Sequence, residues 1–137
     1  MLKQERDAIS VGWQRIGDEV LRDANLLRNQ GSYRSSVSRS YYAAYSYLAS
    51  ALVQEQSVTF KIDREGPEHD LSDMVAKHLH NYFSIKVLPD VRLGIKTLYE
   101  MRLVADYKPR ASVRREIAIE ALQLATTIAN NVRRCGD

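Results

Sequence analysis

Hydrophobic residues recur along this chain at intervals of three and four, the spacing that places side chains on one face of an α-helix. Polar residues, glycines and prolines separate five such periodic segments. The predicted helices cover about residues 11–29, 33–56, 70–84, 89–107 and 112 onward. Because most connections between them are short, the pattern predicts an all-α antiparallel bundle of about five helices, a single domain over residues 1–137.

Local signals mark several helix ends. Gly31 follows the first helix, where a left-handed glycine commonly ends a helix, and Ser32 is expected to cap the second helix with its side chain. Pro89 is acceptable in the first turn of the fourth helix. Residues 58–62 alternate like a strand but have no partner, so we interpret them as an extended loop. The first helix is expected to bury Trp13, Ile16, Val20, Ala24 and Leu27, and the fifth Val113, Ile117, Ala121, Leu124, Ile128 and Val132.

Arg102 interrupts the apolar face of the fourth helix. The residues that precede it on that face are Leu88, Val91, Ile95 and Leu98. The next helical step reaches Arg102 and the one after it reaches Asp106, one turn away, where two side chains of a helix meet. A guanidinium on an inward face is costly unless it is paired. Together with the adjacent Tyr107, this charged pair is either a structural ion pair or part of a functional pocket.

The second helix carries the densest run of aromatic residues. Tyr41 and Tyr45 share a face with Leu48, and we expect them to pack in the core. Arg39 and Tyr42 lie toward an adjacent face. Because each of the two places a hydrogen-bond donor on a partly apolar face, they are candidates for an interface or a polar pocket.

Composition is that of an ordinary globular chain. Of the 137 residues, 45% are hydrophobic and 27% charged, which is enough for one domain with a real core. No apolar run approaches the ~18 residues of a membrane span, and the first residues are too charged for a secretion signal. A single cysteine, Cys135, allows no internal disulfide. These features favour a cytoplasmic protein.

The net charge of +3 is only mildly basic, so the distribution of charge is more informative than its total. Four basic residues follow the fourth helix within a short segment: Lys108, Arg110, Arg114 and Arg115. Two interpretations remain open. The cluster either consists of solvated charges at helix ends or contacts the backbone of a nucleic acid.

The histidines and the missing motifs exclude several kinds of chemistry. On a continuous helix, His78 and His80 lie about 200° apart and cannot share a metal ion. The chain has no cysteine pair, no histidine–carboxylate metal motif and no glycine-rich phosphate loop, so we predict neither a metal nor a cofactor. His69 precedes the third helix. It is a candidate for a cap, a pocket residue or a general acid.

These elements, in this order, resemble the HEPN family of small helical domains found in higher eukaryotes and prokaryotes. The resemblance covers most of the chain, from the first helix to the end of the fourth. The matching segments are residues 26–27, 31–33, 39–45, His69 and 102–107.

The resemblance implies a helical bundle that usually forms a homodimer. Many members are RNA-cleaving toxins or antiviral defence nucleases, and others pair with a small nucleotidyltransferase-type partner, as in toxin–antitoxin systems. Nuclease members carry an arginine followed four to six residues later by a histidine. Here the arginine corresponds to Arg102, but Tyr107 occupies the approximate place of the histidine.

Two functions follow as hypotheses. In the first, the chain binds RNA or a nucleotide and acts as a metal-independent endoribonuclease. Arg102 would then contact phosphate, Asp106 would orient it, and Tyr107 and His69 would complete the catalytic site. In the second, the chain is a non-catalytic binding or assembly subunit. Its ion pair would then be structural, and its aromatic helix would contact a second copy or a partner.

Overall fold

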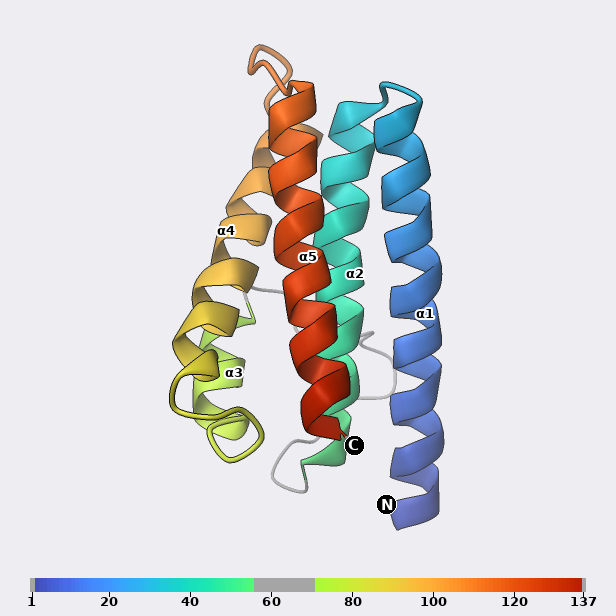
Figure 1. The fold of residues 1–137 in the computed structure, drawn as a ribbon, viewed down its shortest axis with the longest axis vertical. Helices are drawn as coiled ribbons and strands as arrows, with labels where there is room; N and C mark the ends of the chain where they lie inside the picture. Colours follow the sequence, from blue (N-terminus) through green and yellow to red (C-terminus); the bar gives the residue numbers. More distant parts are fainter. Residues whose placement is uncertain (1, 56–70, 137) are drawn as a thin grey trace.

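The structure is a computed structural model that describes residues 2–55 and 71–136. These residues form helices and no strand. The helices are α1 (Lys3–Asn29), α2 (Tyr33–Gln54), α3 (Ser72–His78), α4 (Val87–Tyr107) and α5 (Arg115–Gly136). The four long helices run alternately up and down, as Figure 1 shows. The predicted all-α bundle is therefore confirmed.

The helix α2 lies at the centre of the bundle and contacts each of the other four helices. Its sequence suits this position because small residues alternate with large apolar ones, which lets neighbouring helices approach closely from several sides. The buried small residues of α2 are Ser36, Ser40, Ala43, Ala44, Ser46, Ala49, Ser50 and Ala51. Tyr41 and Leu48 are buried between them, as predicted, and Tyr45 is half-buried against the same core.

The face of α1 that packs on α2 matches the prediction at Ala24, which is buried, and departs from it at Ile16. Its buried residues are Ser10, Gly17 and Ala24, spaced seven apart, and Ile16 remains 45% exposed. Gly17 is required by a close approach, because a Cβ atom there would stand 3.0 Å from the ring of Tyr47. Small residues on α1 thus admit a large ring from α2. In α5 the predicted Ala121, Ile128 and Val132 are buried, alanines make up much of the same face, and Ile117 is exposed.

Several predicted helix boundaries were wrong. The helix α1 begins eight residues earlier, at Lys3, and α5 begins at Arg115 instead of near residue 112. The third helix spans only Ser72–His78, and turns follow it up to α4. Two tertiary contacts account for this early end, because the ring of Phe83 is buried and the hydroxyl of Tyr82 donates to the carbonyl of Val132 in α5.

The turn between α1 and α2 confirms one prediction and corrects another. Gly31 has a φ of +81° and ends α1, as expected from its sequence position. The amide of Ser32 donates to the carbonyl of Leu27 at 2.8 Å and closes this turn. The side chain of Ser32, however, makes no capping hydrogen bond, because its ψ of 69° departs from the extended backbone of an N-cap.

None of the described helices combines the length and the apolar composition needed to cross a membrane.

Candidate functional site

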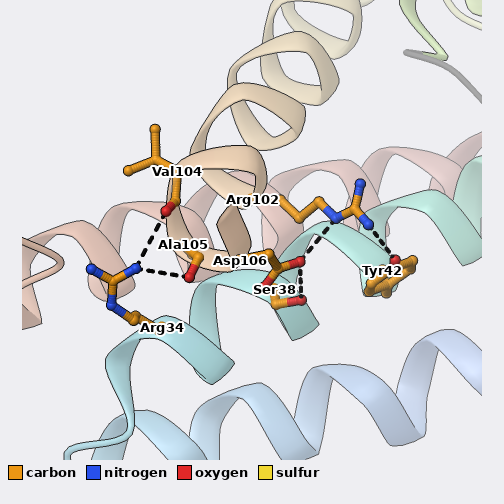
Figure 2. A network of polar contacts seen from close by, with 7 residues as sticks. All are labelled: Arg34, Ser38, Tyr42, Arg102, Val104, Ala105 and Asp106. Atoms are coloured by element: carbon orange, nitrogen blue, oxygen red, sulfur yellow. Dashed lines mark hydrogen bonds and ion pairs between the residues drawn. The ribbon is translucent and has the colours of Figure 1, made fainter. Parts of the chain in front are cut away.

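Arg102 and Asp106 of α4 meet two residues of α2 (Figure 2). The Nε of Arg102 donates to Oδ2 of Asp106 at 3.1 Å, and its Nη2 donates to the hydroxyl of Tyr42 at 2.9 Å. Ser38 donates to the same Asp106 oxygen at 3.2 Å. Each helix contributes two residues one turn apart, so the two faces match where α4 lies beside α2. We call these four residues, together with Tyr41 and Tyr107, the Arg102 cluster.

Three tyrosine rings surround the guanidinium of Arg102. Its central carbon lies 5.3 Å from the ring centre of Tyr42, 5.7 Å from that of Tyr41 and 5.6 Å from that of Tyr107. At these distances the negative faces of the rings attract the cation. Tyr41 is buried, whereas Tyr42 and Tyr107 are 38% and 66% exposed. The cluster is therefore closed on its inner side and accessible on its outer side.

The environment keeps Arg102 charged. Burial acts to lower its pKa, but the neighbouring Tyr42, Tyr107 and Asp106 outweigh this effect, so the pKa of Arg102 is raised above its ordinary value. The side chains of Arg102 and Asp106 are 18% and 28% exposed. The expectation that this pair lies on a core face was therefore wrong in degree. The buried residues of α4 are Val91, Gly94, Ile95, Leu98 and Ala105, and Arg102 stands at the solvent margin of this face.

The pairing leaves Arg102 able to bind an anion. A guanidinium has five N–H donors, and the two hydrogen bonds to Asp106 and Tyr42 use only two of them. The remaining donors have no acceptor among the residues that the structure describes. A planar cation with free donors, held by an ion pair and by aromatic rings, is suited to phosphate.

Arg34, which no sequence pattern indicated, anchors the end of α4. Its guanidinium donates to the carbonyls of five residues: Val104 (3.3 Å), Ala105 (2.9 Å), Lys108 (3.1 Å), Pro109 (3.4 Å) and Ala111. The last carbonyls of a helix have no partner within it, and a cation there also offsets the helix dipole. Arg34 therefore holds the last turn of α4, which carries Asp106 and Tyr107, against the start of α2. Its separation of about 70 positions from these carbonyls explains why no local pattern could reveal it.

The predicted basic segment is accessible. Lys108, Arg110, Arg114 and Arg115 are all exposed in the connection between α4 and α5 and at the start of α5, directly after the Arg102 cluster. Arg114 makes one local hydrogen bond, from its Nε to the hydroxyl of Ser112 at 3.3 Å. The segment therefore presents its charges to solvent beside the end of α4.

The remaining candidates make no contact with the cluster in the described structure or cannot be placed. Arg39 is exposed on α2 and makes no hydrogen bond with the residues described. His69 lies outside the described residues, so its predicted role stays a prediction. His80 lies in the turns after α3, not on a continuous helix with His78. Within residues 2–55 and 71–136, no group of three or more histidine, cysteine or acidic residues is arranged to hold a metal ion.

Comparison with known proteins supplies the family. No curated protein and no solved structure matches the chain. A family model described as the HEPN domain matches residues 11–135, which include the Arg102 cluster and nearly all of the bundle. The chain therefore belongs to the HEPN domain family.

Proposed function

We propose that this protein binds RNA and that the Arg102 cluster contacts an RNA phosphate. The observation that carries the proposal is the state of Arg102, which is charged, partly exposed and held by Asp106 and Tyr42, with donors left over for an anion. Charge-assisted hydrogen bonds from such a group are among the stronger polar contacts that a protein forms.

The surroundings of the cluster support a nucleic-acid ligand over a simple anion. The exposed ring of Tyr107 offers a surface on which an unpaired base stacks, as aromatic residues do in proteins that bind single strands. The exposed basic segment, Lys108 to Arg115, continues from the same end of α4 and supplies charge for neighbouring phosphates. Arg34 keeps the two parts in register through its bonds to the turn between them.

A second candidate function is metal-independent cleavage of that RNA, as in toxin–antitoxin or antiviral defence systems. Cleavage requires a base for the ribose 2′-hydroxyl, a cation for the phosphorane charge and an acid for the leaving oxygen. Arg102 is suited to the second task. The Tyr42 hydroxyl, bonded to Arg102 at 2.9 Å, favours this candidate because it places a proton donor beside the bound phosphate. The proposed base is His69.

The partner proposals follow from the family. A homodimer would bring two copies of the Arg102 cluster to one composite cleft, and a nucleotidyltransferase-type protein would serve as the neutralising partner.

If the chain is instead a non-catalytic assembly subunit, few side chains of α2 are available for contacts with a partner. Tyr41 and Tyr47 are buried inside the bundle and Tyr45 is half-buried, so Arg39 and Tyr42 are the exposed side chains of residues 39–47 that a partner can contact.

The test uses labelled total tRNA and mRNA with the purified protein in the presence of EDTA, and it measures binding and cleavage separately. Arg102→Ala is compared with Arg92→Ala, which removes an exposed arginine of the same helix outside the cluster. Loss of RNA binding in the folded Arg102→Ala protein alone supports the proposed site. Equal binding by both variants overturns it. Cleavage by the wild-type protein that disappears in Arg102→Ala supports the nuclease, and binding without cleavage contradicts it.

A further inference from the structure

A second polar site lies on another side of the bundle. A groove of about 760 Å³ is lined by residues of α1, α2 and α5. Figure 1 shows α2 lying between and behind α1 and α5. None of the lining residues comes from α4, which carries Arg102. The volume falls within the range of about 300–1,000 Å³ that is common for small-molecule sites. Nothing in the Arg102 cluster depends on this groove.

The floor of the groove is a hydrogen-bonded triad from three helices. Tyr47 of α2, whose side chain is otherwise fully buried, donates its hydroxyl proton to Asp18 of α1. Arg133 of α5 pairs with the same carboxylate oxygen, donates to the Tyr47 hydroxyl at 2.7 Å and lies 5.0 Å from the centre of its ring. Because the one carboxylate lining the groove is neutralised in this way, it opposes an incoming anion only weakly.

The rim of the groove has unneutralised positive charge. Arg22 and Arg28 of α1 both line it and form no ion pair with the residues described. Arg28 donates only to the amide oxygens of Asn25 and Asn29, at 3.1 and 3.0 Å. All hydrogen bonds of Arg133 run through its Nη2, which leaves its Nε and Nη1 donors without a protein acceptor in the described structure. Three guanidinium groups thus face the groove against a single, already paired carboxylate.

The opposite wall adds neutral hydrogen-bonding groups and an apolar surface. Gln123, Thr126 and Thr127 of α5 supply amide and hydroxyl groups, and Leu122 of the same helix supplies apolar contact, to which Leu21 of α1 adds. Phosphate groups are commonly bound by arginine together with hydroxyl and amide donors. Apolar walls suit an organic body attached to the phosphates.

We propose that the groove between α1 and α5 binds a compact phosphorylated anion, held by Arg22, Arg28 and Arg133. The spacing of the arginines favours a di- or triphosphate group over a single phosphate. Arg28 lies six positions after Arg22, which is about 9 Å along a helix. A di- or triphosphate can engage the two side chains through different phosphates, which a single phosphate cannot offer. The group is either free or attached to a small organic body.

The experiment titrates the protein with inorganic diphosphate and, separately, with a nucleoside diphosphate, by calorimetry and by the NMR shifts of residues 123–127. We expect saturable binding of one ligand per chain. Arg22→Gln and Arg28→Gln should each weaken it about tenfold, the effect of losing one charged hydrogen bond. Arg92→Gln, at an exposed arginine of α4, should leave the affinity unchanged. Circular dichroism checks that each variant is folded.

The two ligands identify the source of the phosphate. Tighter binding of the nucleoside diphosphate assigns the site to an organic phosphate, and equal affinities assign it to a free polyphosphate; both support the proposal. Absence of saturable binding for both ligands overturns it. The proposal is also overturned if Arg92→Gln loses as much affinity as Arg22→Gln and Arg28→Gln. The loss would then reflect only the lower net charge of the protein. Displacement of diphosphate from the groove by single-stranded RNA would also overturn the proposal and would assign the groove to nucleic acid.

Discussion

The substitution Arg102→Ala separates a structural from a phosphate-binding role for the Arg102 cluster. It removes the ion pair with Asp106, the hydrogen bond to Tyr42 and the attraction to three tyrosine rings. A partly exposed pair one helical turn apart contributes about 0.3–0.5 kcal/mol, a hydrogen bond about 1 kcal/mol and a cation over aromatic rings about 0.5–1 kcal/mol. The free energy of unfolding should therefore fall by about 2 kcal/mol.

This loss is smaller than the cost of breaking a buried ion pair, which is about 3–5 kcal/mol. The reason is the surroundings of Asp106. Its side chain is 28% exposed and still accepts the hydrogen bond from Ser38, so the carboxylate left behind remains solvated and paired. Urea unfolding followed by circular dichroism measures the change. Arg102→Lys is a useful companion because it keeps the charge but loses the planar fork of donors.

The effect on RNA should be larger than the effect on stability. Removing a charge-assisted contact to phosphate costs about 1.5–3 kcal/mol, which weakens binding about 10- to 150-fold. Fluorescence anisotropy with a labelled single-stranded RNA measures this, with Arg92→Ala as the control. A loss of stability above about 4 kcal/mol would refute the argument from exposure and make the ion pair structural. Unchanged RNA affinity in a folded Arg102→Ala protein would refute the phosphate role.

Four further predictions follow from named contacts. Arg34→Ala removes the donor to five carbonyls at and just after the end of α4 and should lower the free energy of unfolding by about 2–3 kcal/mol. The change is measured as a lower urea midpoint, and an unchanged midpoint would show that water replaces those hydrogen bonds. Gly17→Ala places a Cβ atom 3.0 Å from the ring of Tyr47 and should lower the free energy of unfolding by about 1–3 kcal/mol, although alanine has the higher helix propensity. A stabilised variant would contradict the close packing. Burial and the hydrogen bond to an aspartate raise the pKa of Tyr47 above its ordinary value near 10. The unfolded chain then loses this proton first as the pH rises above 10, so the folded state loses stability, and Tyr47→Phe should flatten the decline measured by urea unfolding at alkaline pH. An unaltered slope would exclude Tyr47 as its source. Charge reversal at Arg114 and Arg115 should weaken RNA binding and reduce its dependence on salt, and an unchanged salt slope would remove this segment from the RNA site.

Features that depend on nearby residues were determined by the sequence alone. The three-and-four spacing of apolar residues was sufficient to predict a helical bundle, because amphipathic helices must bury one face each. Gly31 ended the first helix as predicted, because a left-handed residue at that position favours glycine. The pairing of Arg102 with Asp106 was predictable for the same reason, since residues one turn apart on a helix always meet.

Features that depend on how the helices pack were decided only by the tertiary structure. The periodic pattern placed Ile16 in the core, but the close approach to Tyr47 made Gly17 the inward residue and left Ile16 in solvent. The contact of Tyr42 with Arg102 and the five bonds of Arg34 join positions 60 or more residues apart. The groove between α1 and α5 likewise exists only because both helices pack on α2. Helical periodicity specifies which residues share a face, but the identity of the facing helix and its register are set by side-chain packing across the whole bundle.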